Sequence, residues 1–239
     1  MWQYFGNKGE IAELYPKPKF KKIIEPFAGS ARYSLLHFES DVLLVDKYNV
    51  VVDIWRWLQQ CSREDILKLP RLRQGERLSD YSFDCKEARD LLGFLIGSNV
   101  PSPKKQATGI VAHRKNHINY QLVSIANNLF KIKHWEIRLG DYSDIQNVEA
   151  TWYIDPPYQV KGGDGYVYGN KDIDYSRLGE WCKSREGQVI VCESLPADWL
   201  PFRGLKRKSN GMRGTWTMEA IWSNYPTDYD IEQLHLPLE

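Results

Sequence analysis

Short apolar runs rich in β-branched residues alternate with helical patterns along much of the chain. The runs that predict buried strands occupy residues 22–27, 42–46, 135–139, 150–154 and 188–192. Helical character is found at residues 34–38 and 176–183, and residues 215–223 alternate as a late strand, expected in a hairpin at the sheet edge. Strands that alternate with helices predict an α/β fold with a mostly parallel sheet and helices on both faces.

The pattern changes in the middle of the chain, where helical stretches are separated by segments rich in proline, glycine and serine. These helical stretches occupy residues 51–60, 86–96 and 119–130. No apolar strand is evident among them. We therefore expect residues 58–133 to form a helical insertion, and residues 1–57 together with 134–239 to form the main domain.

Composition is that of an ordinary globular protein. The 239 residues are 42% hydrophobic and 26% charged, which suits one domain with an insertion. No apolar run approaches the roughly 20 residues that span a bilayer, and the first ten residues lack the features of an export signal. We expect a cytoplasmic protein with no membrane partner and no obligate protein partner.

The four cysteines are scattered, without a C-x-x-C pair and without histidines at ligand spacing. Buried free thiols, and no metal site, are the expectation.

Charge is unevenly distributed, although the net charge is only +1. Residues 63–133 hold thirteen lysines and arginines against seven acids, and residues 203–213 hold five basic residues and no acid. Two basic patches on a nearly neutral chain are either a nucleic-acid footprint or a solvated surface.

The segment Asp155-Pro156-Pro157-Tyr158 follows directly on the predicted strand at residues 150–154, at the edge where open α/β sheets bind ligands. The two prolines fix φ and remove two backbone donors, so the segment is rigid and offers acceptors. Asp155 and the Pro156 carbonyl can each accept one hydrogen of an amino group, and Tyr158 offers a ring that can stack on a base. A rigid turn without chemistry is the alternative interpretation.

This segment resembles the catalytic motif of amino-methyltransferases, in which D-P-P-Y belongs mainly to adenine enzymes. Residues 25–31, EPFAGSA, resemble the cofactor loop E-P-F-x-G-x-G of the Dam-type DNA adenine methyltransferases, except that Ala31 replaces the last glycine. The resemblance implies that Glu25, Pro26, Phe27 and Gly29 bind S-adenosylmethionine, and that Asp155 also contacts it. Gly29 also permits a tight turn and close approach of the backbone to a ligand.

Asp46 ends the next strand about twenty residues after the loop, a spacing at which an acid reaches the ribose of a nucleoside-containing cofactor. It resembles, with Asn49, the ribose-binding acid of the family. Asp141 resembles the acid that contacts the adenine of the cofactor, although an aspartate here is also a good helix N-cap.

The N-terminal segment at residues 4–8 resembles the aromatic-x-Gly-x-Lys element of the same family. The resemblance implies that Lys8 donates to the methionine carboxylate and that Tyr4 forms an aromatic wall near the sulfonium. The glycine-rich residues 159–172, with Tyr166 and Tyr168, are expected to order over a flipped base or to be a plain surface loop. Residues 219–225 resemble the closing strand of the family, to which we assign a structural role.

Together these motifs, in the order of the family, imply a seven-stranded, Rossmann-like class I methyltransferase fold. The implied reaction is methyl transfer to a flipped adenine of double-stranded DNA, with residues 58–133 as the target-recognition domain. Three asparagines, Asn99, Asn116 and Asn119, are candidates for reading base edges. Basic residues assigned to the DNA phosphates are Lys104, Lys105, Arg114, Lys115, Lys206, Arg207 and Lys208.

Three alternatives stay open at this point. The first is methylation of RNA adenine or of the cytosine amino group, which is chemically similar. The second is a catalytically silent DNA-binding relative, suggested by Ala31 and the short insertion. The third is a dinucleotide-dependent oxidoreductase, because EPFAGSA is also Rossmann-like.

Overall fold

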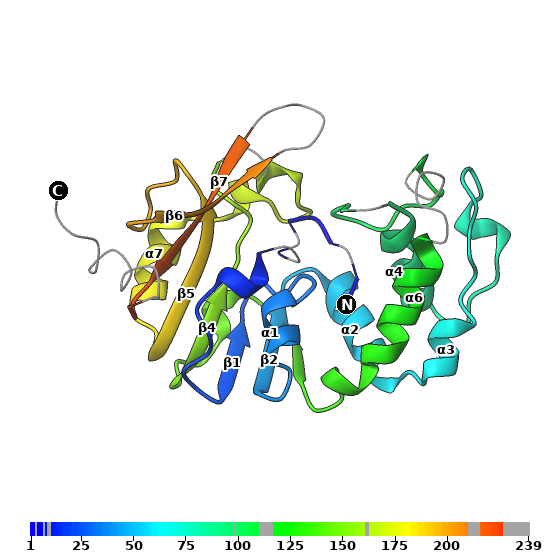
Figure 1. Ribbon diagram of the computed structural model, residues 1–239, viewed down its shortest axis with the longest axis horizontal. Coiled ribbons are helices and arrows are strands. Elements are labelled where there is room, and N and C mark those ends of the chain that lie inside the picture. Colours follow the sequence, from blue (N-terminus) through cyan, green and yellow to red (C-terminus); the bar gives the residue numbers. More distant parts are fainter. Residues whose placement is uncertain are drawn as a thin grey trace.

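A computed structural model gives the arrangement of the chain (Figure 1). It describes residues 1–2, 4–6, 8, 11–97, 99–109, 117–160, 163–209 and 216–226, with the backbone alone at residues 206–209 and 216. The protein has an α/β fold around one seven-stranded, mostly parallel sheet. The strands are β1 Lys22–Glu25, β2 Asp41–Asp46, β3 Glu136–Leu139, β4 Ala150–Ile154, β5 Gly187–Ser194, β6 Arg203–Ser209 and β7 Trp216–Ser223.

The strands lie in the order β3-β2-β1-β4-β5-β7-β6. Strands β1 to β5 pair in parallel, whereas β7 runs antiparallel to both of its neighbours, β5 and β6. The predicted late strand is therefore confirmed as one arm of a hairpin at the edge of the sheet. Its partner β6 has no counterpart in the sequence-based prediction, in which residues 203–213 are a basic patch.

Six α-helices accompany the sheet in the described residues. They are α1 Arg32–Leu36, α2 Asn49–Gln60, α3 Arg63–Leu67, α4 Lys86–Gly97, α6 His117–Asn128 and α7 Tyr175–Lys183. Short 3-10 helices occupy Ala12–Leu14, Leu78–Asp80, Leu129–Ile132, Tyr142–Asp144, Gly163–Gly165 and Asn170–Asp172. Each end of the expected helices agrees with the structure within two residues. Helix α3 has no counterpart in the sequence-based prediction.

Each central strand sends alternate side chains to two separate cores, as the period of a strand requires. Ile23 and Leu44 pack with α1, α2, α4 and α6 on one face, and Ile24 and Leu43 pack with α7 on the other. Helices therefore cover both faces, as predicted.

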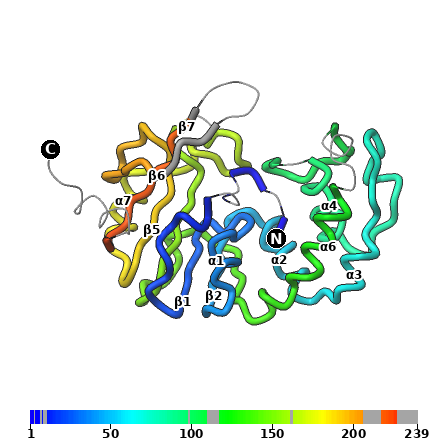
Figure 2. Tube along the Cα trace, viewed as in Figure 1, coloured from blue at the N-terminus to red at the C-terminus, as the bar shows by residue number. Residues whose placement is uncertain are grey.

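The helices α3, α4 and α6 lie together beside the β3 edge of the sheet (Figure 1). They contact one another and, through α2, the sheet. The expected boundary at residue 58 falls inside α2, whose buried residues share one core with α4 and α6. The N-terminus lies beside α2 as well (Figure 2). The Trp2 and Trp55 rings are 4.6 Å apart there. The division into a main domain and an insertion stays a prediction.

All four cysteines are free thiols; Cys61, Cys182 and Cys192 are buried, and Cys85 is half-exposed. No helix of the described residues is both long and apolar enough to cross a membrane. In the same residues, no group of three or more potential metal ligands comes together.

Candidate functional site

One cleft lies where the parallel strands β1, β2, β3 and β4 end, and its volume is about 970 Å³ including the open mouth. The chain leaves β1 toward β2 on one side and leaves β4 toward β5 on the other, so the cleft lies at the switch point at which open α/β sheets bind ligands. Most of the residues assigned from the sequence to catalysis and to the cofactor line it, together with two tyrosines of the glycine-rich loop. These are Tyr4, Lys8, Glu25, Pro26, Phe27, Gly29, Asp46, Asp141, Asp155, Pro157, Tyr166 and Tyr168.

The loop after β1 is fixed from both sides. The Gly29 amide donates to Asp46 Oδ2 at 2.9 Å, and Trp55 Nε1 donates to the Gly29 carbonyl at 2.9 Å. Gly29 has φ of 45°, and a Cβ there would lie 3.2 Å from the Tyr4 ring. Glycine is therefore favoured here, because it adopts this conformation without strain and leaves room for the Tyr4 ring.

Ala31, which stands where the family pattern has its last glycine, also adopts the left-handed conformation, with φ 46° and ψ 48°. A glycine would adopt this conformation without strain, and alanine accepts a modest cost. Ala31 therefore has a backbone conformation that a glycine in its place could also adopt.

Asp46 lies at the end of β2 with its carboxylate held by backbone amides. Its Oδ1 accepts from the Tyr48 amide at 2.8 Å, in addition to the bond of Oδ2 with Gly29. Burial raises the pKa of Asp46 to about 6 against the opposing effect of these bonds.

A ring pair and a second acid lie next to Asp46 in the cleft. The rings of Phe27 and Tyr142 stack with centroids 5.6 Å apart. Asp141 accepts from the Ser143 amide at 3.1 Å, as an N-cap does, and from Lys47 Nζ at 3.3 Å. Asp141 therefore caps the short helix and lines the cleft at the same time.

Glu25 is 2% exposed and turns its carboxyl group toward α1, where Oε1 accepts from the Ser34 amide at 2.7 Å. Burial raises its pKa to about 8. The predicted cofactor residue Glu25 thus also fixes the start of α1.

The N-terminal segment and the glycine-rich loop contact each other across the cleft. Tyr166 Oη donates to the Phe5 carbonyl at 3.2 Å, and the two rings meet edge to face. A Cβ on Gly6 would lie 1.8 Å from Tyr166 Oη, so only glycine permits this contact. The described part of the loop, which includes Tyr168 beside Tyr48, therefore lies over the cleft.

Lys8 lies at the base of the cleft and forms an ion pair with Asp155. Lys8 Nζ is 2.7 Å from Oδ1 and 2.9 Å from Oδ2, and it also donates to the Gly6 carbonyl at 3.0 Å. Burial alone would lower the pKa of Lys8, but Asp155 and Glu219 outweigh it and raise the pKa. The resemblance assigns Lys8 to the methionine carboxylate; in this structure its ammonium contacts Asp155, in the D-P-P-Y segment.

Tyr158 has its hydroxyl bound to Glu219 Oε1, and the Lys8 ammonium lies 4.7 Å from its ring centre. Its ring is therefore committed in part to Lys8 and is less free to stack on a base than the sequence suggested. The D-P-P-Y segment is also fixed through its backbone, because Tyr175 Oη donates to the Pro157 carbonyl at 2.5 Å. No described residue donates to the Pro156 carbonyl, although Pro156 itself is buried and does not line the cleft.

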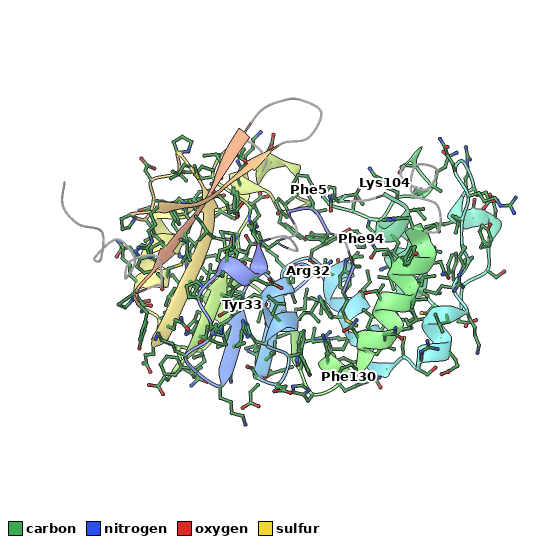
Figure 3. The ribbon with its side chains drawn as sticks, viewed as in Figure 1. Phe5, Arg32, Tyr33, Phe94, Lys104 and Phe130 are labelled. Atoms are coloured by element: carbon green, nitrogen blue, oxygen red, sulfur yellow. The ribbon has the colours of Figure 1, made fainter. Side chains whose placement is uncertain are left out.

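The basic residues assigned to DNA are only partly described. Lys104 and Lys105 are exposed and line a groove with Arg77 and Arg89. Phe5, at the cleft, and Lys104 lie along the same upper side of the molecule in Figure 3. The backbone of Lys206, Arg207 and Lys208 forms β6. The side chains of these three residues, and the whole of Arg114, Lys115 and Asn116, lie outside the described residues.

Of the other two asparagines, Asn119 accepts from Arg71 at 3.3 Å and is thus engaged within the protein, and Asn99 adopts φ of 50° in a turn. Sequence reasoning missed three functional candidates, Glu219, Tyr15 and Tyr142. The signal for Glu219 was present, since an acid inside an alternating apolar strand is expected to have a buried partner.

Comparison of the chain with protein-family models and with curated protein sequences finds no match.

Proposed function

We propose that this protein is an S-adenosylmethionine-dependent methyltransferase that methylates the exocyclic amino group of adenine in DNA. The observation that carries the proposal is the convergence of the motifs. Residues from five segments between Tyr4 and Asp155, singled out in the sequence one by one, line a single cleft at the carboxyl ends of the parallel strands.

The residues of the cleft fit this cofactor chemically. Asp46 is an acceptor for ribose hydroxyls, and its backbone partners hold it in place. Phe27 and Tyr142 supply aromatic surface for a purine ring, and Asp141 supplies an acceptor beside them.

The cofactor, when bound, supplies an electrophilic methyl group on a sulfonium. The protein's part in the reaction is to orient the amino nitrogen that attacks it. Asp155 and the Pro156 carbonyl are acceptors for the two amino hydrogens, which directs the nitrogen lone pair toward the methyl group. Tyr175 donates to the Pro157 carbonyl, whereas no described residue donates to that of Pro156.

A nucleic-acid substrate is supported by the groove of Arg77, Arg89, Lys104 and Lys105. The groove adjoins the cleft, because Tyr48 lines both. Phosphate contacts in the groove would position a strand without reading its sequence. The choice of DNA over RNA rests on the resemblance of the motifs.

The sheet topology favours the class I methyltransferase fold over the dinucleotide-dependent oxidoreductase. The classic dinucleotide-binding sheet has the parallel order 3-2-1-4-5-6. Here a seventh, antiparallel strand, β7, separates β5 from β6. A catalytically silent relative is disfavoured as well. The acid of the D-P-P-Y segment, Asp155, is present in the cleft, and Ala31 adopts the left-handed conformation that a glycine would favour.

The test is transfer of a labelled methyl group from S-adenosylmethionine to unmethylated DNA, with RNA in a parallel reaction and Asp155→Ala as the inactive variant. The modified nucleoside is identified by mass. We expect methyladenine in DNA and its loss in the variant. Methylcytosine as the product would show that the substrate base is cytosine, and methyladenine in RNA alone would show that the substrate is RNA. An absence of cofactor binding would refute the proposal.

A further inference from the structure

Glu219, on β7, is a buried acid beside the catalytic motif for which the function proposed above provides no role. Its side chain is nearly inaccessible, at 7% exposure. Its Oε1 accepts hydrogen bonds from Tyr158 Oη and, at 3.0 Å, from Tyr15 Oη. The same oxygen is 3.8 Å from Lys8 Nζ. Two tyrosines thus orient the carboxylate toward a lysine that is already paired with Asp155.

The ammonium of Lys8 competes with any substrate for Asp155. An ammonium has three donors, and those of Lys8 serve both oxygens of Asp155 and the Gly6 carbonyl. An amino group that binds Asp155 must therefore displace Lys8 from at least one oxygen. A buried ammonium without a negative partner costs several kcal/mol, so displacement is unfavourable unless a second carboxylate is within reach.

We propose that Glu219 is this second partner, which holds the Lys8 ammonium while Asp155 accepts a hydrogen bond from the target amino group. The inference rests on the proposed function and makes Glu219 a positioning residue. Lys8 keeps its proton throughout, and no covalent bond is made or broken in the exchange. Only a short movement is needed, because Nζ already lies 3.8 Å from Glu219 Oε1.

Glu219→Gln separates charge from hydrogen bonding, because glutamine retains an oxygen acceptor for the tyrosines. We expect kcat to fall about tenfold or more, equivalent to at least about 1.4 kcal/mol in the barrier, with affinity for S-adenosylmethionine unchanged. Glu219→Asp, which keeps the charge, should recover part of the loss. Glu180→Gln, an exposed acid on α7 paired only with Lys183, is the control that should leave kcat unchanged.

A second measurement needs no cofactor and no activity. The melting temperatures of Lys8→Met, Glu219→Gln and the double variant form a cycle. If Glu219 serves Lys8, the double variant is less destabilised than the sum of the single variants, because loss of either partner already removes their interaction. Glu193→Gln is the matched control, since this buried acid on β5 accepts from Gln159, Ser194 and Trp199, and its shift should add to that of Lys8→Met.

The outcomes separate the two proposals. An additive cycle for Glu219, or wild-type kcat in Glu219→Gln, overturns the inference in a protein that transfers methyl groups. Absence of methyl transfer by the unaltered protein overturns the proposed function, and with it the role of Glu219 in that reaction.

Discussion

The two halves of the cleft are built in different ways. Around β1 and β2 the acids are satisfied by backbone amides: Glu25 by Ser34 and Asp46 by Gly29 and Tyr48. Around β4 and β7 the charged side chains satisfy one another, as Asp155, Lys8 and Glu219 do. Backbone donors are fixed by the fold, whereas an ion-pair network can exchange partners. The first half is suited to holding a cofactor in one position, and the second to releasing one partner for another.

The largest expected effect is a loss of stability when the cation of the second half, Lys8, is removed. Lys8→Met leaves the carboxylates of Asp155 and Glu219 close together without a cation, and we expect a loss of about 3–5 kcal/mol in the free energy of unfolding. Urea denaturation at neutral pH measures it. Lys21→Met, which removes an exposed pair with Asp41, should cost about 0–1 kcal/mol. Equal losses in the two variants would contradict the account.

The next effect belongs to Glu25 in the first half. Its folded-state pKa of about 8 exceeds its ordinary value of 4.5. The folded state therefore retains a proton that the unfolded state releases, so stability from this group falls as pH rises from 4.5 to about 8 and stays low above it. Glu25→Gln keeps the acceptor for Ser34 and should be more stable than the wild type by roughly 1–3 kcal/mol at pH 9.

At pH 5 the Glu25→Gln variant and the wild type should differ little, because the wild-type carboxyl group is then protonated when folded. Denaturation at both pH values provides the comparison. A variant that is equally or less stable than the wild type at pH 9 would show that the Glu25 charge is compensated in the folded protein.

Asp46 offers a smaller test of the first half through binding. Burial raises its pKa to about 6, and ribose hydroxyls bind the ionised form. We expect affinity for S-adenosylmethionine to be constant above pH 7 and to fall about tenfold per pH unit well below pH 6, since one proton must then be released. Calorimetric titration measures it, and the slope should be absent in Asp46→Asn. A slope that persists in this variant would assign the proton to another group.

The smallest effect concerns the loop between β1 and α1. Ala31→Gly relieves the left-handed conformation of Ala31 but makes the unfolded chain more flexible, so the net gain in stability should be below about 1 kcal/mol. Ala28→Gly, at a buried position outside the left-handed region, should instead lose about 0.5–1 kcal/mol. Thermal unfolding of both variants gives the comparison. Equal losses of stability would show that the left-handed conformation of Ala31 carries no strain that glycine relieves.

The same division explains how far the sequence could predict the protein. The first half is encoded locally: Gly29, in the loop after β1, lies only 17 residues from Asp46 at the end of β2, and the apolar runs of these two neighbouring strands are evident in the sequence. In the second half, Lys8 is 147 residues from Asp155, and Tyr15 is 204 residues from Glu219. Nothing in the local pattern indicates such pairs.

The missed strand β6 has a physical reason too. Its residues Lys206, Arg207 and Lys208 are charged, and an edge strand needs no apolar run. Helix α3 was missed because a helix of five residues gives little periodicity, although Ser62 and Asp65 form a capping box at its start.

The most direct test of the account separates binding from transfer between the two halves. Cofactor affinity by calorimetry and methyl transfer to DNA are measured for Asp46→Asn and Asp155→Ala. We expect Asp46→Asn to bind S-adenosylmethionine about tenfold or more weakly, and Asp155→Ala, which removes the acceptor for the amino group, to bind it as the wild type does but to transfer no methyl group. Unchanged binding in Asp46→Asn, or undiminished transfer in Asp155→Ala, would contradict the proposed division of the cleft.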